Sequence, residues 1–211
     1  MDKKRTIAAA LCIIPAVILL LIVPMRRKET KYFADRGKVF GTYYNVQYEA
    51  DDNLQSDILS AFEAFDNSLS MFNPNSVISH INQNRDTVTD VYFEQMWQEA
   101  ARVYQESNGA FDITVAPLVN LWGFGFKNRE QVTQEKIDSL LPLVGFDKVH
   151  LTAHHVVKND PRTMLDASAV AKGQACDMIA ALLTDKGCQN YLVDIGGEVV
   201  AKGVNKQGQP W

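Results

Sequence analysis

Asp166 and Lys172 stand where an apolar strand pattern gives way to an alanine-rich helix pattern, in the segment MLDASAVAKGQACD (164–177). The N-terminus of a helix presents free backbone N–H groups and a partial positive charge, and both favour an anion. A carboxylate and a lysine at such a junction suit a site for a phosphate group and its metal. The same residues also fit a structural role, with Asp166 capping the helix and Lys172 solvated on the surface. The residues of this segment leave both roles open.

One position bears on the metal version of this site, because Ala169 has no side-chain oxygen. If position 169 is a ligand, only its backbone carbonyl could serve a hard cation such as Mg²⁺. The histidines of the chain form no H-x-x-x-H pair on a predicted helix, and the sequence contains no nucleophile elbow or convincing triad. A hydrolase interpretation therefore lacks a nucleophile.

Two further segments combine glycine with a carboxylate. In GAFDITVAPLVNLWGFG (109–125), glycine and aromatic residues could bring backbone N–H groups and ring faces close to a flat ligand. The residues alone favour a loop that crosses the core, with Asp112 hydrogen-bonded to nearby backbone. In YLVDIGGE (191–198), paired glycines after a buried strand permit a close ligand approach. The alternative there is a common sheet bulge, with Asp194 hydrogen-bonded locally.

The spacing of apolar residues predicts the elements that position these segments. Ser76 is a candidate helix cap, and another helix is expected to start at Asp90. Helices gather early in the chain and strands late, with spacings too short for regular β-α-β units. The fold class is therefore α+β, with mixed or antiparallel sheets and packed helices. Strands are expected at 39–49, 148–152, 155–158, 163–166, 190–195 and 198–201, and helices at 54–72, 76–82, 90–108, 133–141 and 169–186.

Charge divides the chain into two unequal parts. The formal net charge is −4, but residues 1–28 carry six Lys and Arg residues against one Asp, so they contribute +5 and the remainder −9. An acidic globular part disfavours nucleic acid as a partner. It remains compatible with a divalent metal and an anionic ligand.

Residues 1–28 are predicted to be a signal anchor. The run from Thr6 to Met25 contains no charged residue and, as a helix, spans ~30 Å, the thickness of a bilayer hydrocarbon core. No small-residue cleavage site follows it, which favours an uncleaved transmembrane helix over a cleaved signal peptide. Lipidation of Cys12 is disfavoured by the large residue before it. A charged linker, 29–38, is expected next.

Cys176 and Cys188 are the other two cysteines of the chain. The first lies within a predicted helix and the second just beyond its end, without metal-type spacing. We expect both to be core thiols. A disulfide between them remains open in an oxidising compartment.

The glycine-rich, lysine-containing and double-glycine segments, in this order and spacing, resemble the FAD:protein FMN transferase family, the ApbE-type flavin transferases. The resemblance also includes GTY (41–43), SVISHIN (76–82) and GQPW (208–211), and it covers nearly everything after the anchor. It implies a flavin transferase fold in which residues 39–211 form the N-terminal part of the domain.

This resemblance implies an enzyme anchored in the bacterial inner membrane, with its catalytic domain on the periplasmic side. Such enzymes use Mg²⁺, split FAD at its pyrophosphate and transfer FMN to a threonine hydroxyl of a partner protein, releasing AMP. The implied partner is a flavin-acceptor protein such as a respiratory redox-pump subunit. Two alternatives are a pyrophosphatase that gives free FMN and AMP, and a carrier that binds FAD without catalysis.

The resemblance also implies roles for individual residues. Lys172 and Asp166 would be catalytic, and the Ala169 carbonyl would bind Mg²⁺, as its lack of a side-chain oxygen already suggests. Phe40 and Phe72 occupy positions where family members often have Met and Tyr. The residues that would contact FAD are Phe40, Phe72, Ala110, Phe111, Asp112, Asp166 and Lys172.

One departure from the family pattern concerns the metal site. The family's later H-x-[IV]-[DN]-P-x-T-G segment, and the Asp and Thr that complete its metal site, have no counterpart in this sequence. We therefore expect a fragment of a longer protein or a truncated gene product. Alone, this part would hold only some of the catalytic residues.

Overall fold

The computed structural model describes residues 31–124 and 131–211. The predicted anchor, 1–28, and Cys12 lie outside the described residues. Within the described ranges, no helix is long and apolar enough to cross a membrane.

A four-stranded antiparallel sheet, in the order β1-β2-β5-β6, forms one layer of the molecule. β1 (Lys31–Val39) and β2 (Thr42–Ala50) form a hairpin, and β2 also pairs with β5 (Tyr191–Ile195), which continues into β6 (Glu198–Lys202). Side chains alternate along β2, so that every second residue from Tyr44 is buried. This apolar face is the one that the helices cover.

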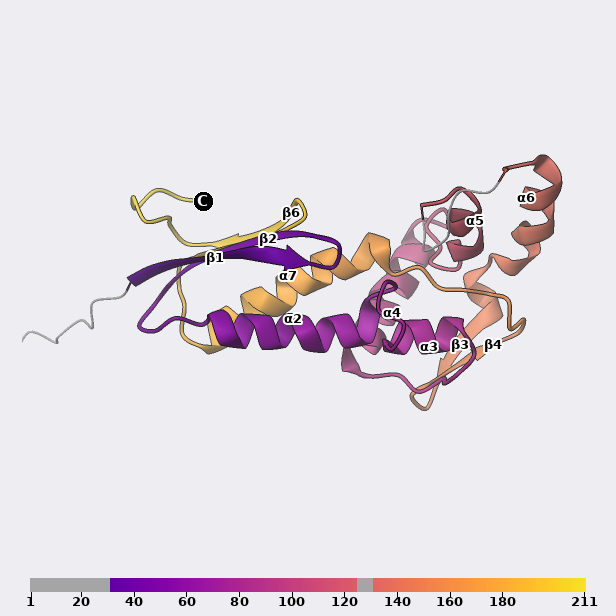
Figure 1. Cartoon of the computed structure of the whole chain (residues 1–211), viewed down its shortest axis with the longest axis horizontal. Coiled ribbons are helices and arrows are strands. Elements are labelled where there is room, and N and C mark those ends of the chain that lie inside the picture. Colours follow the sequence, from indigo (N-terminus) through magenta and orange to yellow (C-terminus); the bar gives the residue numbers. More distant parts are fainter. Residues whose placement is uncertain (1–30, 125–130) are drawn as a thin grey trace, which may run out of the picture.

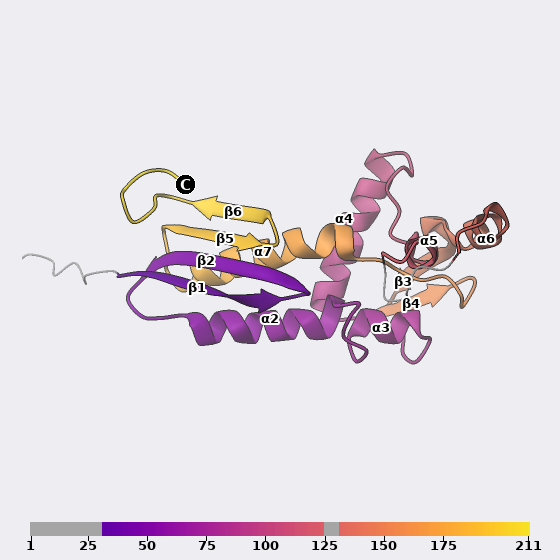
Figure 2. The ribbon, with the colours of Figure 1, turned by 45° about the horizontal axis from the view of Figure 1, so that its top comes forward.

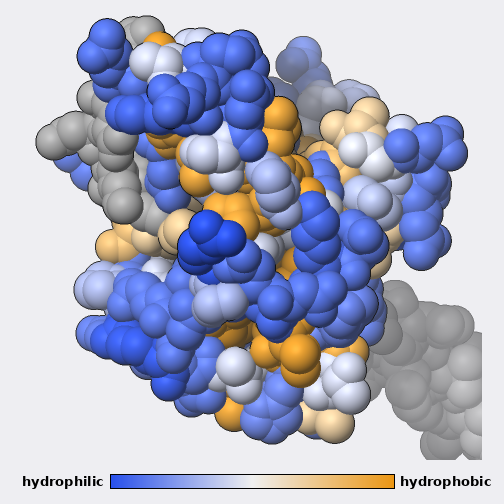
Figure 3. Space-filling model, turned by 90° about the vertical axis from the view of Figure 1, so that its right-hand side faces the viewer, coloured by the Kyte–Doolittle hydropathy of each residue, from blue (hydrophilic) through white to orange (hydrophobic). Residues whose placement is uncertain are grey.

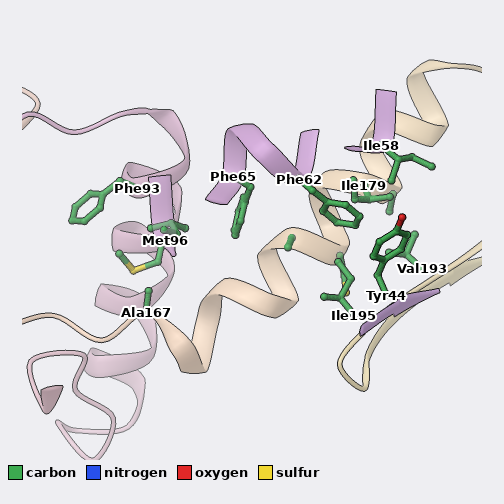
Figure 4. Packing of buried hydrophobic residues seen from close by; sticks show 14 of the residues in the cluster. Tyr44, Ile58, Phe62, Phe65, Phe93, Met96, Ala167, Ile179, Val193 and Ile195 are labelled. Carbon is green, nitrogen blue, oxygen red and sulfur yellow. The ribbon is translucent and has the colours of Figure 1, made fainter. Parts of the chain in front are cut away.

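Two long helices cover that face. α2 (Gln55–Leu69) and α7 (Ser168–Asp185) lie side by side beneath the sheet, as the views in Figures 1 and 2 show. Phe62 and Phe65 of α2 point toward side chains of β2, β5 and α7 in the core (Figure 4). Burying apolar residues of this size stabilises the fold by about 1.5–3 kcal/mol each. The start of α7 is therefore held against the sheet and against α2.

The remaining elements lie at the end of the molecule to which α7 points its N-terminus (Figure 1). Ser76 accepts a hydrogen bond from Ser79 N, and Asp90 accepts one from Phe93 N, so both are helix caps as predicted. These elements are α3 (Val77–Asn82), α4 (Val91–Glu106), α5 (Ala116–Leu121), α6 (Gln134–Leu140), the 3₁₀ helices η1 (Leu141–Leu143) and η2 (Phe146–Lys148), and a hairpin of β3 (Val149–Thr152) and β4 (His155–Lys158).

The α+β class is confirmed, but three segments differ from the prediction. Helix α5 lies within 109–125, where a loop was expected. The expected linker, 29–38, is from Lys31 onward an edge strand that pairs along its whole length with β2. The expected strand at 163–166 is not a strand. Met164 makes an isolated bridge to Val115, while Leu165 is held by the side chain of Asn82.

Both described cysteines are buried free thiols, so the prediction of core thiols is confirmed and no disulfide joins Cys176 to Cys188. Burial raises the pKa of the Cys176 thiol to about 11. The thiol is therefore protonated at neutral pH and able to donate a hydrogen bond.

Candidate functional site

Asp166 lies two residues before the first residue of α7 and accepts a hydrogen bond from it. Its Oδ1 accepts a hydrogen bond of 2.8 Å from Ser168 N, and its own N–H donates to Ile113 O at 2.7 Å. Among the described residues, its second carboxylate oxygen has no hydrogen-bond partner. Asp166 is thus not the N-cap, which is Ala167, although one of its oxygens contacts the start of the helix. The other oxygen remains available to a ligand.

Lys172 is not simply a solvated surface residue. Its Nζ lies 3.4 Å from Glu198 Oε1 on β6, and its side chain is 38% exposed. The role of Glu198 was not evident from the residue types and their spacing. The pair joins positions 26 residues apart, and the only signal for it was a carboxylate directly after the double glycine.

A hollow of about 180 Å³ opens where the β1–β2 turn, the end of α2 and the start of α7 meet. It brings together Phe40, Phe72 and Lys172, three residues that the resemblance assigns to FAD. Its walls are largely apolar and include three phenylalanines, and Lys172 is the one cation among its lining residues. Pockets that hold a whole drug-sized ligand usually measure about 300–1,000 Å³. This hollow therefore has room for part of a dinucleotide, such as a ring with an anionic group nearby. The full lining is Phe40, Phe65, Leu69, Ser70, Met71, Phe72, Ser168, Ala171 and Lys172.

Phe40 is placed over this hollow by an unusual backbone. It has φ of 51° and the following Gly41 has φ of 73°, which is the pattern of a two-residue hairpin turn with both central residues left-handed. Its ring packs against Phe62 and Phe65 of α2, at centroid distances of 5.8 and 5.4 Å. Phe72, in contrast, is 65% exposed. The wall formed by Phe40 is therefore fixed by packing, whereas the wall formed by Phe72 is open to a ligand.

Asp112 holds the glycine-rich segment, 109–125, in place through hydrogen bonds. Its Oδ1 accepts hydrogen bonds from the N–H and the hydroxyl of Thr114, and its Oδ2 accepts one from Phe146 N at 2.9 Å. The Thr114 hydroxyl in turn accepts from Gly145 N at 2.7 Å. These contacts match the core-crossing loop that the residues favoured. A contact of Asp112 with FAD remains a prediction.

A second hollow, of about 630 Å³, lies between α4 and α7 and contains Phe111 and Ala169. The residues assigned to FAD and metal are thus divided between two sides of the first turns of α7, with Asp166 at the junction. Ala110 is exposed and lines neither hollow. Gln174, which the sequence did not mark, lines the second hollow with a buried Oε1 that has no hydrogen-bond partner in the described part of the chain. The full lining is Gln95, Glu99, Val103, Phe111, Ala169, Val170, Gly173, Gln174 and Asp177.

A complete magnesium site is not formed by the described residues. Across 31–124 and 131–211, no three His, Cys, Asp or Glu side chains are grouped so that they could hold a metal ion. Ala169 is exposed in the first turn of α7 and offers only a carbonyl. A single carbonyl does not satisfy the octahedral oxygen coordination of Mg²⁺. The assignment of Ala169 therefore rests on the resemblance alone.

A separate hollow of mixed character occupies the end of the molecule formed by α5 and α6. It measures about 410 Å³, and its lining includes the apolar Leu121 and Leu140 as well as Lys136 and Arg162. Figure 3 shows this end, where hydrophobic surface runs between hydrophilic side chains. None of the residues assigned to FAD or metal lines it.

Comparison with known proteins identifies relatives over most of the chain. A "FAD:protein FMN transferase" of Haemophilus influenzae is 35% identical over 213 aligned residues, covering 93% of this chain. A protein of the same name from Vibrio cholerae is 33% identical over 93% of this chain. This chain spans 62% of the length of each of these two relatives.

Solved structures give the same result. The flavin transferase ApbE from Vibrio cholerae superposes with a TM-score of 0.81 at 32% identity, covering 86% of this chain and 62% of that one. The apo form of the Pseudomonas stutzeri flavinyl transferase ApbE gives 0.78 at 28% identity, covering 86% of this chain and 64% of that one. The model of the ApbE family matches residues 40–211, so this chain belongs to the ApbE family.

Proposed function

We propose that the protein carrying this chain transfers FMN from FAD to a threonine of an acceptor protein and releases AMP. The observation that carries this proposal is the aromatic hollow at the start of α7, where Phe40, Phe72 and Lys172 converge. The names of the relatives support the same activity, and their bacterial sources fit the proposed setting.

In the proposed reaction, a threonine oxygen forms a bond to the phosphorus of the FMN half. The pyrophosphate bond breaks, AMP leaves with the bridging oxygen, and the threonine hydroxyl loses its proton. Phosphoryl transfer of this kind depends mainly on positioning and charge neutralisation. Lys172 and the N-terminus of the 18-residue helix α7 supply positive charge beside the hollow. The second carboxylate oxygen of Asp166, which no described residue contacts by a hydrogen bond, would help to orient the ligand.

Mg²⁺ belongs to the proposal as the ion that would neutralise the pyrophosphate when bound. The Ala169 carbonyl would be the one ligand offered by this part of the protein. We also propose that residues 1–28 anchor the protein in the bacterial inner membrane, with the catalytic domain in the periplasm. The charge-free run 6–25 supports that location. The proposed acceptor is a respiratory redox-pump subunit.

Product analysis tests this function. The protein is incubated with FAD and Mg²⁺, with and without an acceptor protein, and in parallel with a chelator. We expect flavin covalently bound to the acceptor, AMP in equal amount, and neither product with the chelator or with the acceptor threonine changed to alanine. Free FMN and AMP formed without acceptor would instead identify a pyrophosphatase. Bound FAD without AMP release would identify a carrier.

A further inference from the structure

Glu198 is the carboxylate that faces Lys172. Its Oε1 lies 3.4 Å from Lys172 Nζ, and the two side chains are 52% and 38% exposed. Glu198 is the first residue of β6 and follows the Gly196-Gly197 turn directly. The cation that we assign to the phosphate is therefore already opposed by an anion in the absence of a ligand.

The backbone beneath Glu198 is fixed from several sides. Asp194 Oδ1 accepts a hydrogen bond from Gly197 N at 3.0 Å, and Gly196 N donates to Tyr43 O at 2.9 Å. The Cys176 thiol of α7 donates to Glu198 O at 3.2 Å. The double-glycine turn thus holds the Glu198 backbone against α7, where its side chain can reach Lys172.

We propose that Glu198 is a latch on Lys172, a competing anion that is exchanged for a phosphate oxygen when a phosphorylated ligand enters the first hollow. This inference rests on the proposed function, because it takes Lys172 to be the phosphate-binding cation. An ion pair as exposed as this one is weak, so a multiply charged pyrophosphate can displace the carboxylate. A ligand without a strong anion cannot, and Lys172 then stays paired. The latch therefore lowers the affinity for phosphorylated flavins and leaves the affinity for uncharged flavins unchanged.

Glu198→Gln tests this competition because it keeps the side-chain shape and removes the charge. The matched control is Glu106→Gln, which makes the same charge change at a residue paired with Arg102 on α4. Binding of FAD and of riboflavin, which has no phosphate, is measured by fluorescence titration at low and high salt. We expect E198Q to bind FAD about two- to five-fold more tightly at low salt. This is the change in affinity that corresponds to the small free energy of an exposed ion pair, which FAD must break in the parent protein. Riboflavin binding should not change, and the gain for FAD should shrink at high salt.

Three results would overturn the latch: FAD affinity unchanged in E198Q, the same gain for riboflavin, or the same gain in E106Q. A further test uses Lys172→Ala, because in that background E198Q should give no gain.

Inorganic pyrophosphate, measured by calorimetry, separates the latch from the proposed function. If E198Q tightens pyrophosphate binding but the parent protein transfers no FMN, the latch stands and the function fails. If FMN is transferred but E198Q changes the affinity for neither FAD nor pyrophosphate, the function stands and the latch fails.

Discussion

Replacing Asn82 with alanine removes both hydrogen bonds that hold the segment leading into α7. The buried Asn82 side chain donates to Leu165 O at 2.9 Å and accepts from Leu165 N at 2.8 Å. These are the two backbone hydrogen bonds that a neighbouring strand would otherwise make with Leu165, the residue that precedes Asp166. Leu165 is fully buried, so water cannot replace the lost partners without rearrangement.

The expected cost follows from these two bonds. Leaving a buried backbone donor and a buried acceptor without partners costs about 1–3 kcal/mol each, so we expect a loss of about 3 kcal/mol after partial relaxation. With a urea dependence of about 2 kcal/mol per M, the unfolding midpoint should fall by about 1.5 M. FAD affinity should fall as well, because Asp166 and the first turn of α7 follow this segment.

Urea unfolding followed by circular dichroism measures this loss, with Gln83→Ala as the exposed neighbouring control. Asn82→Asp adds a second test, because the ionised carboxylate keeps the acceptor but cannot donate to Leu165 O. The loss of stability of N82D relative to the parent protein should become smaller at acid pH, where the protonated carboxyl can donate a hydrogen bond again. A midpoint for N82A within about 0.3 M of the Q83A control would refute the reasoning, since that is a difference of only about 0.6 kcal/mol.

Two further predictions concern the turn at β5–β6 and the contact between α4 and the β3–β4 hairpin. Gly196→Ala should destabilise more than Gly197→Ala in thermal unfolding. Both have positive φ, but only at 196 would a Cβ meet a β2 side chain at 2.8 Å. Equal losses would show that the close approach is unimportant. Hydrogen bonds from the Thr89 hydroxyl and the His154 imidazole hold the pKa of Glu94 below its ordinary 4.5. Its stabilisation is therefore present above pH 4.5 and is lost as pH falls through the lower, folded-state pKa. In urea unfolding, the stability of Glu94→Gln should fall less steeply than that of the parent protein as the pH is lowered. An equally steep fall in both proteins would contradict this.

The sequence predicted the helices better than the first strand. Ser76 and Asp90 act through contacts three residues away, so their capping could be predicted from spacing alone. β1 was missed because its inward-facing positions include Asp35, a charged residue that usually signals solvent exposure. In the structure Asp35 is buried and accepts a 2.7 Å hydrogen bond from the Tyr48 hydroxyl. That pairing depends on the hairpin register, which the pattern of β1 alone does not give.

The candidate site was predicted in part. The junction at Asp166 and Lys172 is local, so residue types and helix physics were sufficient to find it. The meeting of Phe40 with Phe72 depends on how the β1–β2 turn lies over the end of α2. The contact between Lys172 and Glu198 likewise depends on how α7 lies against β6. Contacts between elements that are far apart in the sequence produce no periodic pattern of residue types, so they could not be predicted from it.

The role of Lys172 in FMN transfer is the central claim, and Lys172→Ala tests it most directly. The control is Lys186→Ala, which removes a lysine that pairs with Asp57 at the opposite end of α7. Both variants are first shown to melt like the parent protein, and the initial rate of FMN incorporation into the acceptor is then measured with FAD and Mg²⁺. We predict a loss of about 100-fold or more for K172A, as when one charge-stabilising group is removed from a transfer site, and almost none for K186A. Equal rates for the two variants would contradict the account.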